Sequence, residues 1–270
     1  MKNIIHHNLF KSALLGMSVL ASSVAFAYDR IVVLTPDVGD VLTAMGGANK
    51  IVGKDDVNRN PLLKNAKNIG LHRNLTVEPI VAMKPDLVVG SHMAVPTSIY
   101  QRLSGLGIKA ENVAPDESVA TYAKSIRTLG GYIGESQKAN VMANAWTSGM
   151  KALPKTKKRY ILSYDGRIVA GRGTVGDELI RRAGGINAAN IDGLKPLSRE
   201  GWLAANADVI IIAEHHKVTL GTVEQLKKRP ELANSPAAKN DKIFYWPAND
   251  FLRYGLDSPQ VLQKLHNAAK

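Results

Sequence analysis

Residues 75–90 read LTVEPIVAMKPDLVVG, and residues 197–212 read LSREGWLAANADVIII. Both stretches place an acidic residue near the start of a short helical segment and an aspartate before a run of apolar, mostly β-branched residues. Glu78 corresponds to Glu200, and Asp86 corresponds to Asp208. Because a repeated helix-then-strand unit is the mark of a duplicated architecture, the sequence predicts two similar α/β halves.

Two further motifs recur in the same order. The triplet VGD stands at residues 38–40 and again at 175–177, and the pair GG stands at 46–47 and again at 184–185. Short apolar strands that alternate with helices predict a parallel sheet covered by helices in each half. We therefore predict an N-terminal α/β lobe over residues 28–116, a helical connector over 117–154 and a C-terminal α/β lobe over 155–270. The ligand is expected in a cleft between the lobes.

The strongest local patterns give the expected elements. Strands are predicted at 30–34, 51–53, 86–89, 159–163, 209–213 and 243–246, and helices at 38–45, 78–83, 99–106, 135–153, 175–183 and 258–268. In the connector, glycines near residue 130 separate a first helix from a longer second one, and Pro154 follows the second because proline cannot continue a helix. Ser258 is a plausible N-cap for the last helix.

The first 27 residues have the features of a signal peptide. Lys2 and Lys11 supply positive charge, residues 13–21 form a short apolar run, and Ala25, Phe26 and Ala27 form a small-x-small cleavage site. We predict cleavage after Ala27 and export to a bacterial periplasm. Without cysteine, the chain has no disulfide, thiolate metal site or lipid-bearing cysteine.

The net charge of +12 at pH 7 raises the question of a nucleic-acid partner. The positive charges are dispersed. The densest cluster, at residues 155–159, contains no aromatic residue between its basic side chains. We therefore predict no nucleic-acid partner and favour a surface that attracts an anionic ligand.

Known catalytic motifs do not appear in the chain. The turn GRGT at residues 171–174 lacks the ending of a phosphate-binding loop and the third glycine of a dinucleotide site. No serine stands in a GxSxG context, and no HExxH motif is present. Hydrolase chemistry is therefore unsupported, and the two similar halves favour a two-lobed binding protein, so we predict a binding protein and not an enzyme.

Five histidines remain after residue 27, namely His72, His92, His215, His216 and His266. One hypothesis gathers His72, His92 and one of the pair at 215–216 with a carboxylate around a bare zinc or manganese ion. The other gives one axial ligand per lobe to a metal that a large organic ligand already holds. In that hypothesis His72 supplies an imidazole and Tyr164, which follows a predicted strand, supplies a phenolate oxygen. Tyr164 has a simple alternative as an aromatic side chain that packs beside the strand end.

Other polar and apolar side chains are predicted to contact the ligand. Arg73 and Arg172 can pair with carboxylates of an anionic ligand, Met93 offers an apolar surface for a flat ring, and His92 lies in a loop expected to face the cleft. Arg172 has a simple alternative as a solvated side chain in a turn.

Glu78 and Glu200 hold equivalent positions in the two halves. They are either acids favoured by the dipole at a helix start, or a pair of surface carboxylates presented to paired arginines of a two-fold partner.

The chain resembles the periplasmic binding proteins of haem, cobalamin and iron–siderophore ABC importers over essentially all of residues 28–270. The resemblance rests on RIVVL at 30–34, GLHRNL at 70–75, EPIVAMKPDLV at 78–88, AGRGT at 170–174, AGGIN at 183–187 and KPLSRE at 195–200. The motifs AGRGT, AGGIN and KPLS look most like the haem branch.

The resemblance implies two Rossmann-like lobes joined by a single long helix, with little hinge movement. It implies a monomer that carries haem b as its transported ligand and delivers it to an inner-membrane ABC permease dimer. Glu78 and Glu200 match the glutamates that dock on permease arginines. An iron-siderophore or cobalamin carrier of the same fold is the alternative, and a bare zinc or manganese transporter is another.

One departure concerns the iron ligands. Haem-branch proteins usually carry a tyrosine ligand in the first lobe, where this chain has Leu71 followed by His72. A histidine often seen near the matching strand end of the second lobe is here Tyr164. The resemblance thus implies ligation by His72 and Tyr164, with the two donor types exchanged between the lobes, or a cargo other than haem.

Overall fold

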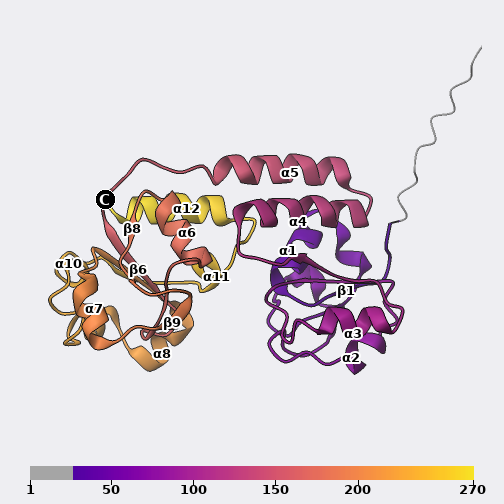
Figure 1. Cartoon of the computed structure of the whole chain (residues 1–270), viewed down its shortest axis with the longest axis horizontal. Helices are drawn as coiled ribbons and strands as arrows, with labels where there is room; N and C mark the ends of the chain where they lie inside the picture. Colours follow the sequence, from indigo (N-terminus) through magenta and orange to yellow (C-terminus); the bar gives the residue numbers. More distant parts are fainter. Residues whose placement is uncertain (1–26) are drawn as a thin grey trace, which may run out of the picture.

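The chain folds around two separate sheets, one in each half of the sequence (Figure 1). The computed structural model describes residues 27–270. Residues 1–26, which hold nearly all of the predicted signal peptide, lie outside the described residues. Within residues 27–270, no helix has the length and apolar character needed to cross a membrane.

The N-terminal sheet is parallel and has five strands in the order β3-β2-β1-β4-β5. The strands are β1 (Ile31–Val33), β2 (Ile51–Lys54), β3 (Lys67–Asn68), β4 (Leu87–Ser91) and β5 (Ala110–Ala114). The helices of this lobe are α1 (Pro36–Ala44), α2 (Glu78–Val81) and α3 (Ile99–Gly105). All three residues of β1 are fully buried, which suits a central strand covered on both faces.

The C-terminal sheet has the order β11-β10-β6-β7-β9, with β8 paired to β6 beside β7. Its strands are β6 (Arg159–Ser163), β7 (Ile168–Ala170), β8 (Ile186–Asn187), β9 (Leu194–Pro196), β10 (Val209–Ala213) and β11 (Ile243–Trp246). β6, β8, β10 and β11 run parallel, whereas β7 pairs antiparallel with both β6 and β9. The helices are α6 (Val175–Arg182), α7 (Arg199–Ala205), α8 (Lys217–Leu220), α9 (Val223–Lys227), α10 (Pro236–Lys239), α11 (Asn249–Leu252) and α12 (Ser258–Ala268).

The repeated aspartates have the same task in both lobes. The carboxylate of Asp86 accepts the backbone N–H of Arg30 at 3.0 Å, and that of Asp208 accepts the N–H of Arg159 at 2.8 Å. Each aspartate therefore ties the start of a central strand to the start of the neighbouring strand. The duplication that the sequence predicted thus has a physical basis in strand pairing.

Two antiparallel helices, α4 (Val119–Tyr132) and α5 (Ser136–Gly149), connect the lobes and lie side by side along one edge of the molecule (Figure 1). α4 packs against α1 and β5 of the N-terminal lobe, while α5 reaches α12 of the C-terminal lobe. Both helices have 14 residues, so the prediction that the second is longer and extends to Leu153 is wrong. Gly149, the last residue of α5, lies directly against Pro259 at the start of α12.

A single apolar core passes through both lobes. It includes Ile31 of the first sheet, Ile126 and Trp146 of the connector helices, and Tyr160 and Leu265 of the C-terminal lobe. The Trp146 indole N–H also donates to the carbonyl of Gly255 at 2.8 Å. The outer faces of the two sheets pack into separate, smaller clusters.

Candidate functional site

Each sheet changes its winding direction between two adjacent strands, and α/β sheets bind ligands beyond the carboxyl ends of the strands at that point. In the N-terminal sheet β2 and β3 lie on one side of β1, and β4 and β5 on the other, so the change falls between β1 and β4. In the C-terminal sheet β8 lies on one side of β6, and β10 and β11 lie on the other, so the change falls between β6 and β10. The residues that follow β1, β4, β6 and β10 therefore form the candidate site.

The N-terminal half of this site contains buried polar groups that form hydrogen bonds with one another. The Ser91 hydroxyl donates to the carboxylate of Asp37 at 3.2 Å, and the Ser91 N–H donates to the hydroxyl of Thr35 at 3.1 Å. The Tyr100 hydroxyl, whose pKa burial raises, donates to the carbonyl of Ser91 at 2.8 Å. All four residues are buried, so these groups position the loop after β4 and bond to one another.

His92 belongs to a contact between the lobes. Its Nδ1 lies 3.2 Å from the carbonyl of Ala114, and its Nε2 lies 3.3 Å from the carboxylate of Glu117. Glu117 also accepts the backbone N–H of Val175, at the start of α6, at 2.9 Å. Burial by itself lowers the pKa of His92, but Glu117 and the carbonyl raise it to a net value above the ordinary one. Burial likewise opposes ionisation of Glu117, yet the bonds from His92 and Val175 lower its pKa. Both ring nitrogens of His92 thus have partners.

His72 lies inside the N-terminal lobe. The residue is 5% exposed, and its Nδ1 is 3.0 Å from a carboxylate oxygen of Asp55, which follows β2 and is fully buried. The sequence predicts that His72 stands in a loop facing the cleft between the lobes, whereas in the structure its ring lies in the interior of the lobe against Asp55. Within the described residues, the buried Nε2 of His72 and the second oxygen of Asp55 have no hydrogen-bond partner.

The C-terminal half of the site holds three rings in mutual contact. Tyr164 follows β6, and His215 and His216 follow β10. The centre of the Tyr164 ring lies 5.2 Å from that of His215 and 4.7 Å from that of His216, and the two imidazole centres are 4.2 Å apart. Burial, followed by the neighbouring His216, lowers the pKa of His215. The sequence shows that the histidine pair follows one strand and that Tyr164 follows another. The three rings meet because β6 and β10 are neighbours in the sheet.

Among the described residues, the other predicted ligand-binding side chains make no hydrogen bond or ion pair with the cluster of Tyr164, His215 and His216. Arg73 is exposed and, within residues 27–270, has no carboxylate within ion-pair distance. Met93 is half-buried beside His92, where its N–H donates to the Ser91 hydroxyl at 3.3 Å. Arg172 donates to Asp192 at 2.7 Å and to Asn190 at 2.7 Å.

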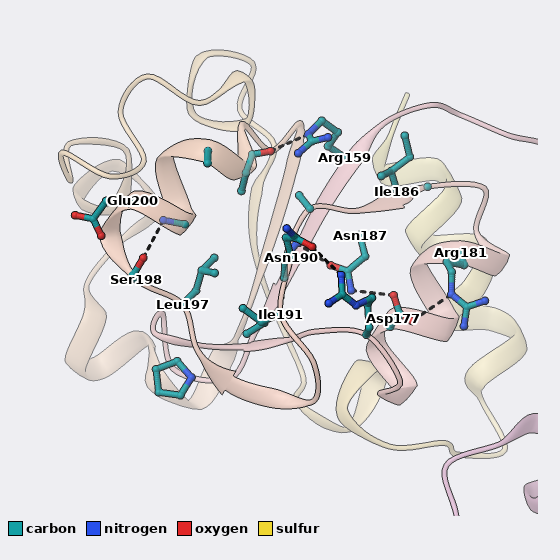
Figure 2. A pocket seen from close by; sticks show the side chains of 18 residues that line it. Arg159, Asp177, Arg181, Ile186, Asn187, Asn190, Ile191, Leu197, Ser198 and Glu200 are labelled. Carbon is teal, nitrogen blue, oxygen red and sulfur yellow. Dashed lines mark hydrogen bonds and ion pairs between the residues drawn. The ribbon is translucent and has the colours of Figure 1, made fainter.

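A cavity of about 1100 Å³ lies within the C-terminal lobe, between α7 and the segment around β8. Figure 2 shows that several of its polar side chains form hydrogen bonds or ion pairs. The amide of Asn187 donates to Asp177 at 3.0 Å, and Arg159 donates to the carbonyl of Ala205 at 2.8 Å. Arg172 lines this cavity, but Tyr164 and His72 do not. Because the predicted iron ligands lie outside this cavity, we place the candidate site at the strand ends.

The bare-metal hypothesis requires three or more ligands to converge. Among residues 27–270, no group of three histidine, aspartate or glutamate side chains is arranged to hold a metal ion. Instead His72 pairs with Asp55, and His92 with Glu117.

Glu78 and Glu200 occupy matching positions on the surface. Glu78 is the first residue of α2 and Glu200 the second of α7, and both are exposed. Bonds from its own backbone N–H, and from Thr76 or Ser198 respectively, lower the pKa of each. α2 and α7 both lie in the half of the molecule remote from α4 and α5 (Figure 1), and the Glu200 carboxylate points away from the neighbouring cavity (Figure 2). The helix-start interpretation and the docking interpretation both agree with these positions.

The two lobes, with donor side chains at the ends of their central strands, define a two-lobed solute-binding protein. Comparison with known proteins identifies the family within this class. The model of the family described as periplasmic binding protein matches residues 31–249, and the chain belongs to that family.

Three similar proteins illustrate the range of the family. The periplasmic heme-binding protein RhuT from Roseiflexus sp. RS-1, in apo form, is 28% identical, with a TM-score of 0.79 over 90% of this chain and 99% of its own. The vitamin B12-binding protein of Salmonella choleraesuis (strain SC-B67) is 27% identical over 198 residues, 70% of this chain and 73% of the relative. The uncharacterized ABC transporter substrate-binding lipoprotein YvrC of Bacillus subtilis (strain 168) is 23% identical over 230 residues, 80% of this chain and 71% of the relative. Members of the family are thus substrate-binding components of ABC transporters.

Proposed function

We propose that this protein captures haem in the periplasm and delivers it to an inner-membrane ABC permease. The observation that carries the proposal is the position of Tyr164 at the winding change of the C-terminal sheet, beside two histidine rings. A phenolate oxygen is an established axial ligand of haem iron. The neighbouring rings give the porphyrin an aromatic surface on which to pack.

The charge of the protein supports an anionic cargo. The formal net charge of +12 becomes +10 (12 − 2) without Lys2 and Lys11 of the predicted signal peptide, and the exposed Arg73 is available for a haem propionate. Met93 offers an apolar contact for the ring from the N-terminal lobe. The similarity to the heme-binding protein RhuT also favours haem.

His72 has one property of a ligand and lacks another. Its Nε2 is a nitrogen without a partner among the described residues, but the ring is buried against Asp55. We therefore propose Tyr164 as the ligand that receives haem first, with His72 engaging iron only after its ring leaves Asp55.

A haemin titration of the chain from residue 28 onward tests the proposal. The Soret band should shift and saturate at one equivalent. Tyr164→Phe should abolish the phenolate charge-transfer band and weaken binding about 10–100-fold. His266→Ala is the matched control, because His266 bonds to the carbonyl of Ala183 in the C-terminal lobe and should leave the spectrum unchanged. Binding that never saturates would refute haem as the cargo.

Cobalamin is the second candidate, favoured by the similarity to the vitamin B12-binding protein. A titration with cyanocobalamin under the same conditions separates the two. Saturable cobalamin binding that excludes haemin would replace the haem proposal.

Delivery requires a surface that the permease recognises. We propose that Glu78 and Glu200 together form this surface, because they are exposed carboxylates at matching places on the two lobes. A permease dimer with two-fold symmetry can present one arginine cluster to each.

A further inference from the structure

The C-terminal strand ends carry two different kinds of metal donor within one cluster. Tyr164 offers a phenol oxygen, and His215 offers imidazole nitrogens from a ring centred 5.2 Å away. His215 is exposed, so its ring is open to a ligand.

His216 holds this pair of donors in place. Its ring contacts both of the others, at 4.7 Å from Tyr164 and 4.2 Å from His215. It is half-buried, and within the described residues its buried Nε2 bonds to nothing. His216 therefore packs against both donors.

The two donors suit different valence states of iron. Fe(III) is the harder ion and binds an anionic oxygen such as phenolate well, whereas Fe(II) carries less charge and favours a neutral imidazole nitrogen. A site with tyrosine alone would lose most of its hold on the iron when the haem is reduced. A site with a histidine one ring away has a second donor available.

We propose that His215 is the axial ligand for ferrous haem, while Tyr164 is the axial ligand for ferric haem, so that the same site retains both forms. This inference rests on the proposed haem function and specifies the ligand class further. No electron transfer by the protein is involved; haem arrives in either state.

The test compares ferric haemin with haem reduced anaerobically by dithionite. Apomyoglobin serves as a scavenger, and the rate of haem transfer is measured for each form. His215→Phe keeps an aromatic ring but removes the nitrogens. It should speed release of ferrous haem by at least about tenfold and change ferric release by less than about threefold. Tyr164→Phe should show the reverse pattern.

Two further variants separate ligation from packing. His216→Leu removes the ring contacts with Tyr164 and His215 and should speed release of both forms alike, whereas Val218→Ala, at an exposed position on α8, is the surface control and should leave release of both forms unchanged. The resonance Raman spectrum of ferrous wild type should show an iron–histidine stretch that His215→Phe lacks.

Equal effects of His215→Phe on ferric and ferrous release would overturn the inference, as would a ferrous wild-type spectrum without the iron–histidine stretch. These outcomes differ from failure of the proposed function, in which ferric haemin itself shows no saturable binding to the wild type.

Discussion

The Glu117 carboxylate accepts the backbone N–H of Val175 at 2.9 Å, which joins the segment before α4 to the first residue of α6 in the opposite lobe. The exposed N–H groups at a helix start carry partial positive charge, so an anion there is stabilised. The other oxygen of Glu117 lies 3.3 Å from His92, and a second contact between the lobes pairs Arg253 with Asp40 at 3.1 Å. The loop after β4 is thus fixed to α6 through a single side chain.

The pair of His92 and Glu117 should make stability depend on pH. The pKa of His92 is raised, so its contribution is complete below about 6.5 and is lost as pH rises through the folded-state value. The pKa of Glu117 is lowered, so its contribution is present above about 4.5 and is lost in acid. His92→Gln should therefore cost about 0.5 kcal/mol between these values and almost nothing at pH 9. Urea denaturation at pH 5.5 and pH 9 measures the difference, and a cost that is the same at both would exclude the charged pair.

Two equivalent glycines should respond differently to the same substitution. Gly46 and Gly184 follow α1 and α6 in left-handed conformations, with φ of 96° and 82°. A Cβ at Gly46 would meet open space, so Gly46→Ala should cost only the backbone term of about 1–2 kcal/mol. A Cβ at Gly184 would overlap the carbonyl of Pro154, so Gly184→Ala should cost at least about 3 kcal/mol. Thermal unfolding of both variants is the measurement, and equal shifts would contradict the close approach of residues 154 and 184.

Removal of His72 should act on stability first. His72→Ala leaves the fully buried Asp55 carboxylate without its partner, which should cost about 3 kcal/mol. The double variant His72→Leu/Asp55→Leu removes both polar groups and should recover part of that loss. His92→Ala, at a half-exposed pair, is the matched comparison and should cost less than about 1 kcal/mol. Denaturant titrations followed by circular dichroism decide between these outcomes.

Loss of both surface glutamates should impair delivery and spare binding. Each exposed ion pair with a permease arginine contributes only about 0.2–1 kcal/mol, so Glu78→Ala and Glu200→Ala should be mild singly. The double variant should slow haem uptake into permease-containing vesicles and reduce its dependence on salt, because the steering charges are gone. Haemin titration of the same variant should match wild type. Unimpaired uptake would return both residues to the role of helix-start acids.

Local sequence patterns identified the buried elements well. The strands at 159–163, 209–213 and 243–246 and the helix at 258–268 have the bounds that the sequence predicts. These segments carry continuous apolar runs or a clear helical period, and both signals are local to the segment. β5 escaped prediction because its sequence, AENVA, is polar at its start and only partly buried. β7 and β9 have three residues each and owe their form to antiparallel pairing with distant partners.

The same distinction applies to the candidate site. That donors follow the strands could be predicted, because strand ends are local features. Which donors meet could not, since the pairing of His72 with Asp55 depends on where two separate loops pack. The contact of Tyr164 with His215 and His216 requires β6 and β10 to be neighbours, and strand order is set by the whole sheet. The prediction of Ser258 as N-cap of the last helix is also wrong, because Asp257 occupies that position.

The apolar core that passes from the first sheet through α4 and α5 into the second lobe makes the molecule one cooperative unit. Neither half can unfold without exposing apolar side chains that pack against the other half. Unfolding of either half would also break the hydrogen bond from Trp146 to Gly255. Heating should then produce a single calorimetric transition, with equal calorimetric and van't Hoff enthalpies. Cleavage between residues 150 and 158 would not release two stable fragments, because each would carry half of a shared interior.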